Sequence, residues 1–341
     1  MESLGFALNA TLPIVFTVLI GYLLKRAGIL SREFAKQANK LVFRIFLPAT
    51  LFINVYSIED MSKIDLGYVL YSALVTIAIF AVGIPIAIIV TSDPKRRGPL
   101  LQSFFRSNQA LIGIPLSELL CPGVGALAAT LLSAVMIPIY NVLAVVSLTI
   151  FSGGEENTDN VQKEHPRVGF YIKKVVLGII KNPLILSIAA GFVVLGIRAL
   201  LRSFDIGFAI SEVPAIWKTL TYLSSLATPL ALLSLGAEFE FSAISGMKKE
   251  LIAGTAARVA VAPLIALGIA VLFFRGTFTS GQFAALLALF CTPVAVSSVP
   301  MTQEMNGDTE LAGQIVLFTT ALSAITIFLA SFILKEIGIF I

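Results

Sequence analysis

The run Arg106 to Gln109 (R-S-N-Q) lies within residues 99–120, a stretch otherwise apolar enough to be a membrane helix. A guanidinium, a hydroxyl and two amides in succession can bind an anion or exchange hydrogen bonds with a polar solute. Gly113 and Pro115 follow closely. Because proline lacks an N–H and leaves one carbonyl unpaired, this pattern predicts a broken helix with free backbone groups beside the polar run.

A second apolar stretch, residues 281–304, carries a matching interruption. Pro293 and Pro300 are seven residues apart, as are Asn108 and Pro115. The helical rise places Asn108 about 13 Å and Pro293 about 18 Å into an apolar core of about 30 Å. Freed backbone groups cost several kcal/mol in lipid unless they face protein or a hydrated cavity. We therefore expect the two breaks to cross near the middle of a membrane and to form a binding site.

The composition is that of an integral membrane protein. Of 341 residues, 57% are hydrophobic and 13% are charged, against about 45–50% and about 25% in soluble domains. The basic residues fall in short loops rather than in one patch with aromatics, which argues against nucleic-acid binding. One histidine and no His-Glu-x-x-His motif argue against an enzyme, a metal site or a cofactor.

Apolar blocks of membrane-spanning length predict an all-α membrane protein with ten transmembrane helices. The blocks are 4–25, 37–57, 66–90, 99–120, 123–151, 172–200, 213–236, 249–274, 281–304 and 310–337.

The orientation follows from the lysines and arginines in the loops. Fourteen of them fall in the loops after blocks one, three, five and seven, and six fall on the opposite side. Basic loops stay in the cytoplasm. We therefore expect a multi-pass protein of the cell (inner) membrane, with both termini outside and the central polar linker, residues 152–171, in the cytoplasm.

The two halves of the chain resemble each other. Similar proline and glycine motifs recur in the same order at Pro13 and Pro183, at Pro48 and Pro229, and at Asn108 and Pro293. Because each half has five blocks, an odd number, the second half enters the membrane from the other face. This pattern predicts two inverted five-helix repeats with broken, crossing helices 4 and 9, a construction found in secondary transporters.

Several motifs resemble those of the auxin efflux carrier family, in its bacterial permease branch. These are N-Q-A-L-I-G-I-P-L, T-P-V-A-V-S-S-V-P-M-T-Q-E-M-N-G-D, the opening L-P-I-V-F-T-V-L-I-G-Y-L-L-K-R-A-G-I-L-S and N-K-L-V-F-R-I-F-L-P-A-T-L-F, and K-N-P-L-I-L-S-I-A-A-G. The resemblance covers nearly the whole chain. In it, Asn108 matches the family's crossover asparagine and Pro293 its counterpart. Plant members have proline where this chain has Ser107. This difference argues against the substrate specificity of the plant members.

The resemblance implies a bile-acid-transporter-like fold with a scaffold and a moving unit. Residues 1–57 and 172–236 would form scaffold helices 1–2 and 6–7, which often dimerise. Residues 66–151 and 249–337 would form the transport unit, helices 3–5 and 8–10. Bacterial members are associated with malate and other carboxylates, and plant members with indole-3-acetate.

These patterns together assign candidate roles. The candidate substrate-binding residues are Arg106, Ser107, Asn108, Gln109, Gly113, Arg258, Pro293, Val294, Ser297 and Ser298, and the helix breaks are Pro115 and Pro300. Arg106 and Arg258 either attract a carboxylate or extend to the inner membrane surface. Glu118 and Glu304 are candidates for carrying a coupling proton, although a place at the membrane surface is favoured.

The sequence thus predicts a secondary transporter of a small organic anion, such as malate or an auxin-like acid, working in the lipid bilayer by elevator-type alternating access. H⁺ or Na⁺ would be the coupling ion. The alternatives are a sodium-coupled bile-acid-type symporter and a non-transporting membrane sensor with the same fold.

Overall fold

The computed structural model describes residues 2–58, 65–151, 176–177, 180–204, 207 and 209–340. The regular structure of these residues is helical throughout, without a β-strand. The predicted all-helical fold is therefore confirmed over the described part of the chain. The predicted linker 152–171 lies outside the described residues.

Seven helices in the described ranges are long and apolar enough to cross a membrane. They are Arg32–Tyr56, α4 (Leu66–Val90), α7 (Gly125–Phe151), α9 (Pro183–Ser203), α10 (Pro214–Glu238), Lys248–Phe274 and α15 (Thr309–Glu336). Two of these contain a π-helical turn. Arg32–Tyr56 comprises α2 (Arg32–Leu41) and α3 (Leu47–Tyr56), and Lys248–Phe274 comprises α11 (Lys248–Ala256) and α12 (Ala262–Phe274). The first predicted block coincides with α1 (Glu2–Arg26).

Two of the predicted spans are each divided into two short helices. The first consists of α5 (Pro94–Phe105) and α6 (Ile114–Leu120), and the second of α13 (Ser280–Cys291) and α14 (Ser298–Glu304). Pro300 lies in the first turn of α14, where a missing N–H removes no intrahelical hydrogen bond. Pro115 instead lies within a continuous helical stretch, formed by the π-helical turn Gln109–Gly113 and α6. The interruptions are residues 106–108 and 292–297, which include Asn108 and Pro293. Pro115 and Pro300, which the sequence pattern gave as the helix breaks, lie in the helices that follow them.

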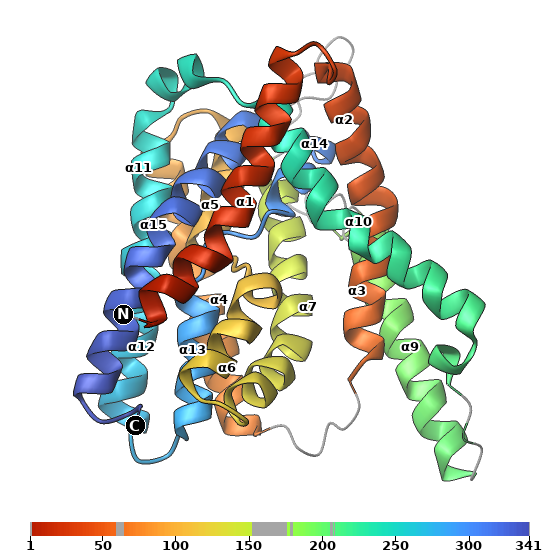
Figure 1. Cartoon of the computed structure of the whole chain (residues 1–341), viewed down its shortest axis with the longest axis vertical. Helices are drawn as coiled ribbons and strands as arrows, with labels where there is room; N and C mark the ends of the chain where they lie inside the picture. The colour runs from red at the N-terminus through yellow and green to blue at the C-terminus, as the bar shows by residue number, and fades with distance from the viewer. Residues whose placement is uncertain are drawn as a thin grey trace, which may run out of the picture.

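The long helices pack in two groups on either side of α7. Figure 1 shows α3, α9 and α10 on one side of α7, and α4, α12 and α13 on the other. Within the first group α3 packs along α9, while α10 packs along α1, which crosses the front of the view. In the second group α13 and α5 both pack against α7. The two broken spans therefore lie beside a continuous helix.

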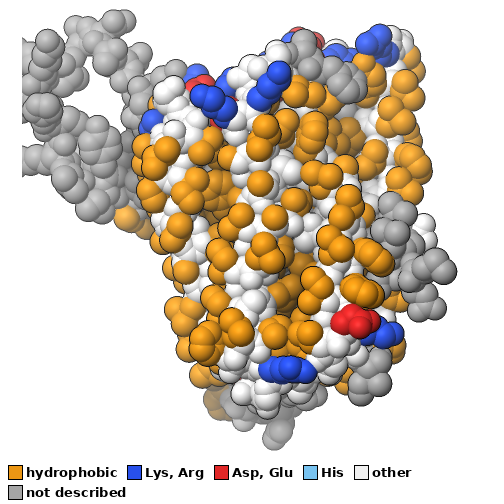
Figure 2. All heavy atoms as spheres, turned by 90° about the vertical axis from the view of Figure 1, so that its left-hand side faces the viewer, with side chains coloured by type: hydrophobic (Ala, Val, Ile, Leu, Met, Phe, Trp, Pro, Cys, Tyr) orange, Lys and Arg blue, Asp and Glu red, His pale blue; other side chains and the backbone are white. Residues whose placement is uncertain are grey.

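Large apolar side chains cover the outside of the molecule. Ile89, Leu264 and Phe273 are 83%, 73% and 74% exposed. Figure 2 shows hydrophobic side chains over the middle of one face, with charged side chains toward the two ends. A band of this kind suits contact with lipid tails rather than with water.

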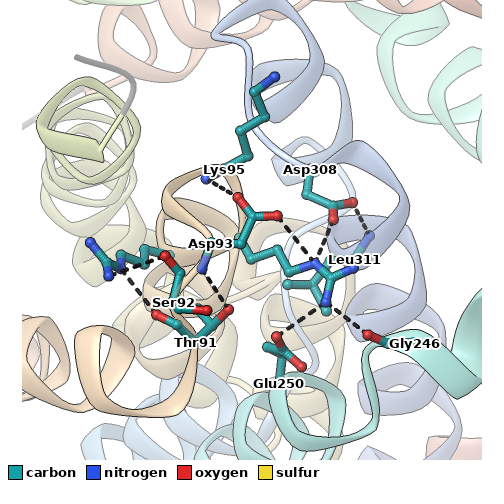
Figure 3. Close-up of polar contacts among 10 residues, drawn as sticks. Thr91, Ser92, Asp93, Lys95, Gly246, Glu250, Asp308 and Leu311 are labelled. Atoms are coloured by element: carbon teal, nitrogen blue, oxygen red, sulfur yellow. Dashed lines mark hydrogen bonds and ion pairs between the residues drawn. The ribbon is translucent and has the colours of Figure 1, made fainter. Parts of the chain in front are cut away.

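One end of the molecule is held together by charged groups from several helices. The Arg96 Nε lies 3.0 Å from Asp308 Oδ2, and its Nη1 lies 3.2 Å from Glu250 Oε1. The same Nη1 donates to the carbonyl of Gly246 at 2.8 Å. Figure 3 shows Asp93, Glu250, Asp308 and Gly246 around this guanidinium. These contacts tie the starts of α5, α11 and α15 together.

Candidate functional site

The two interruptions meet each other. The backbone amide of Asn108 donates to the carbonyl of Pro293 at 2.9 Å, and the hydroxyl oxygens of Ser107 and Thr292 lie 2.7 Å apart. Thr292 donates its own proton to the carbonyl of Ala288 at 2.8 Å, so the Ser107 hydroxyl is the donor of the pair. Its proton is therefore used inside the protein and is not free for a solute.

The backbone groups freed by the breaks find partners mainly through Arg258. This side chain is 0% exposed and donates to the carbonyls of Thr292 at 2.8 Å, Leu289 at 2.8 Å and Phe105 at 3.3 Å. Those carbonyls belong to the C-terminal ends of α13 and α5, where positive charge is favoured. Arg258 thus joins the two broken helices. It is fully buried rather than extended toward the surface, and it does not border the cavity that lies beside the crossing.

A cavity of about 480 Å³ lies between the crossing, α7, α3 and α10. We call it the central cavity. Its lining residues are Leu47, Thr50, Leu51, Asn54, Arg106, Ser107, Asn108, Ala110, Leu111, Ile137, Tyr140, Asn141, Ser224, Ser225, Ala227, Thr228, Pro229, Ala295, Val296 and Ser297. This volume is within the usual range for small-molecule sites, about 300–1,000 Å³.

Arg106 brings a positive charge to this cavity although its side chain is only 2% exposed. Its Nη1 donates to Gln102 Oε1 at 2.8 Å, and its Nη2 donates to Asn141 Oδ1 at 3.0 Å and to Ser297 Oγ at 2.8 Å. All three partners are neutral. No ion pair between described residues includes Arg106, so its charge has no counter-ion within that part of the chain.

Hydrogen-bond donors for an anion lie beside this charge. The side-chain Nδ2 of Asn108 is buried without a hydrogen-bond partner, and Asn108 lines the central cavity. Ser297 accepts from Arg106, which leaves its own hydroxyl proton to donate. A buried polar group without a partner costs about 1–3 kcal/mol. A solute that accepts hydrogen bonds from Asn108 and Ser297 removes the cost of leaving a buried donor unpaired.

Other predicted residues support the crossing without lining the central cavity. A Cβ on Gly113 would come within 3.0 Å of the Ala288 Cβ, so glycine permits close approach to α13. Val294 donates its amide to Thr319 Oγ1 at 3.2 Å. Both amide atoms of Gln109 and the hydroxyl of Ser298 are buried and unpartnered, yet neither residue borders the cavity.

The two carboxylates considered for proton coupling lie away from the cavity. Glu118 is exposed and accepts from the amides of Gly123 at 2.9 Å and Ala126 at 3.3 Å, near the start of α7. Glu304 pairs with Arg44 at 3.1 Å. Both carboxylates therefore have local partners, and neither borders the cavity.

Several cavity residues were not among the sequence candidates. Asn54, Asn141, Thr50, Tyr140, Ser224 and Thr228 line the central cavity from α3, α7 and α10. The sequence could have identified two of them, because Asn54 and Asn141 are isolated side-chain amides in otherwise apolar blocks. Such residues usually face the interior of a bundle. Which interior face they share depends on how the helices pack.

A cavity that carries polar side chains beside two broken helices, in a fold with an apolar exterior, is the arrangement of a membrane transporter. The chain belongs to the Membrane transport protein family, which matches it over residues 6–331. It is 24% identical over 336 residues to an uncharacterized transporter of Methanothermobacter thermautotrophicus, covering 96% of this chain and 98% of the relative. It is 27% identical over 237 residues to an uncharacterized transporter of Methanocaldococcus jannaschii, covering 67% of this chain and 68% of that relative.

The family and these relatives identify a transporter rather than an enzyme. With several apolar helices long enough to span a bilayer, the chain is a multi-pass membrane protein.

Proposed function

We propose that this protein is a secondary transporter of a small organic anion, which binds in the central cavity at Arg106, Asn108 and Ser297. The observation that carries the proposal is the buried guanidinium of Arg106, which has only neutral hydrogen-bond partners among the described residues. Burying a charge without a counter-ion is costly. An anion entering the cavity supplies that counter-ion and meets the free donors of Asn108 and Ser297.

The proposed architecture has ten spans in two inverted repeats, as in the bile-acid-transporter-like fold. Asn108 and Pro293 are separated by 185 positions, the same separation as the hydrogen-bonded pair Ser107 and Thr292. Gly21 of α1 packs against the backbone of Leu233 in α10, and the equivalent Gly191 of α9 packs against Val55 in α3. These reciprocal contacts support a repeat in which each half packs its first helix on the other half's second helix.

The proposed mechanism is an elevator-type movement of residues 66–151 and 249–337 against a scaffold of residues 1–57 and 172–236, which forms the homodimer contact. At the basic end the two units meet through polar side chains, and deeper between them Leu235 of α10 packs against Gly313 of α15. Asn39 donates to Gln303 Oε1 at 2.9 Å, and Gln303 donates to the carbonyl of Lys36 at 2.9 Å. The proposed movement breaks these hydrogen bonds and slides α15 along the apolar faces of α1 and α10.

The orientation and location are proposed from charge. Lys25 and Arg32 pair with Glu240. The carbonyl of Glu240 accepts from Gln314 near the start of α15, where Arg96 contacts Asp308, so these charged groups lie at one end of the molecule. Basic loops favour the cytoplasmic side, so we place this end in the cytoplasm, with the termini outside, in the cell membrane.

The experiment is uptake by liposomes that contain the purified protein. Radiolabelled malate and a panel of monocarboxylates are supplied with sodium or choline as the cation, and at fixed and varied pH. We expect saturable uptake of an acid, and the cation and pH series identify Na⁺ or H⁺ as the coupling ion. If no acid in the panel moves, or if flux does not saturate, the proposal is wrong.

A further inference from the structure

A second cavity of about 440 Å³ adjoins the central cavity. We call it the side chamber. It is lined by Asn9, Pro13, Ile14, Thr17, Leu111, Pro115, Thr228, Pro229 and Leu232. Leu111, Thr228 and Pro229 also line the central cavity. These three residues therefore form the boundary between two spaces that together extend from the crossing to α1.

The walls of the side chamber are mainly apolar, and its polar lining residues, Asn9, Thr17 and Thr228, are uncharged. The hydroxyl of Thr17 donates to the carbonyl of Pro13 at 2.7 Å, within α1, so its proton is already used. Ile14 and Leu232 are 3% and 4% exposed and form apolar walls. No charged side chain is among the residues that line the chamber. A ligand's hydrocarbon is therefore suited to this space, and a second carboxylate is not.

The side chamber also opens outward at the depth of the lipid tails. Pro13, Leu111 and Pro115 line it and are exposed. Pro13 lies near the middle of α1 (Glu2–Arg26), about 18 Å from the helix's basic end at the usual rise per residue. The opening thus faces the bilayer interior between α1 and α6, where amphiphilic molecules dissolve.

We propose that the side chamber binds the apolar part of the transported anion, so that the substrate is an amphiphilic monocarboxylate rather than a dicarboxylate. Arg106 is the one cation among the residues lining either cavity, and it accommodates one carboxylate. The hydrocarbon of the same molecule then passes Leu111 into the side chamber. This inference rests on the proposed function, because it assumes that an anion binds at Arg106.

The test is a chain-length series on the full-length protein in liposomes. Inhibition constants against uptake of a labelled acid are measured for straight-chain monocarboxylates from acetate to decanoate and for succinate. Burying each methylene in the side chamber should improve affinity about fourfold, until the chain reaches the chamber's end. Succinate should bind more weakly than butyrate. A chain-length independent affinity, or tighter binding of succinate, overturns the inference while leaving an anion transporter in place.

A pair of variants locates the effect. Thr17→Phe fills the side chamber without touching the central cavity, and should reduce the affinity of decanoate to that of short acids while leaving acetate unchanged. Thr219→Phe is the matched control, because Thr219 makes the same kind of bond to the carbonyl of Ala215 at 2.8 Å on an exposed face of α10. Equal effects of both variants on decanoate overturn the inference. Failure of every acid to bind the unmodified protein instead overturns the proposed function.

Discussion

Ser107 and Thr292 share a hydrogen bond of 2.7 Å across the crossing of the two broken helices. The bond joins residues 185 positions apart, one from each half of the chain. With the Asn108 amide on the Pro293 carbonyl at 2.9 Å, it fixes the two breaks against each other. Among the polar groups without a partner at this point, the Asn108 side-chain amide borders the central cavity.

Replacing Asn108 by Ala tests the free amide. The backbone bond to Pro293 remains, but the donor Nδ2 is lost from the cavity. A hydrogen bond to a charged group contributes about 1.5–3 kcal/mol, so kcat/KM for uptake should fall at least tenfold. Asn108→Ser restores a donor and should recover part of the loss. Unchanged uptake by Asn108→Ala would show that the amide does not bind the substrate.

Two substitutions of Arg106 test separately the role of its charge and the role of its planar shape. Arg106→Gln removes the counter-charge, and uptake should fall more than a hundredfold, whereas Arg106→Lys keeps the charge but loses the planar fork that contacts Gln102 and Asn141. We expect the lysine variant to retain uptake with a higher KM. Arg97→Gln, at the start of the same broken span, is the control and should match the unmodified protein. If Arg106→Gln still transports an anion normally, the charge has another role.

Arg258 is expected to act on stability. Arg258→Met leaves the carbonyls of Phe105, Leu289 and Thr292 without this donor, and each buried acceptor left unpaired costs about 1–3 kcal/mol. Thermal unfolding in detergent should therefore occur at a clearly lower temperature. Arg275→Met, which removes an exposed arginine bonded to the carbonyl of Ile337, should change it little. Similar unfolding temperatures for both variants would contradict the prediction.

A reversible cross-link tests movement between the two units. On a background lacking Cys121 and Cys291, Arg44→Cys and Glu304→Cys replace an ion pair that joins the two units at the basic end. Bridging them with a reducible bifunctional reagent should stop uptake, and a reductant should restore it. The control pair, Asp65→Cys and Gln282→Cys, replaces a 2.9 Å contact between the N-cap residue of α4 and α13, two helices of the proposed transport unit, and should not block uptake. Uptake that continues across the first link rules out this movement.

Asp65, the N-cap residue of α4, should make the stability of the protein depend on pH. The backbone amide of Tyr68 and the side chain of Gln282 donate to Asp65 and hold its pKa below the usual value. A lowered folded-state pKa stabilises the protein above the unfolded-state pKa of about 3.9, and this contribution is lost as pH falls through the folded-state value.

Asp65→Asn keeps a capping side chain but removes the charge. Its unfolding temperature should be lower than that of the unmodified protein at pH 7. The difference should shrink as the pH falls below about 4 and vanish once the pH is below the folded-state pKa of Asp65. A difference independent of pH would assign the effect to the hydrogen bonds alone.

The order of apolar, polar and proline residues along the chain was enough to predict that two spans are broken. It also predicted that the polar run at Asn108 lies against Pro293. Asn108 and Pro293 could be paired from sequence because proline's missing N–H and the cost of free backbone groups in lipid are properties of single residues and of their depth. The same reasoning placed Arg106 and Ser297 near one site. It left two roles open for each intramembrane arginine, because helix rise gives depth but not the direction in which a side chain points.

Packing decided those directions. Arg106 faces the central cavity, whereas Arg258, at a similar expected depth, turns to the carbonyl ends of α5 and α13. Asn141 and Thr228 reach the same cavity from α7 and α10, helices far apart in the chain. Hydrophobicity and helix-breaking residues act locally and can be read along the sequence. The partners of a buried charge and the boundary of a cavity arise only when separate helices come together, so they were decided by the tertiary structure.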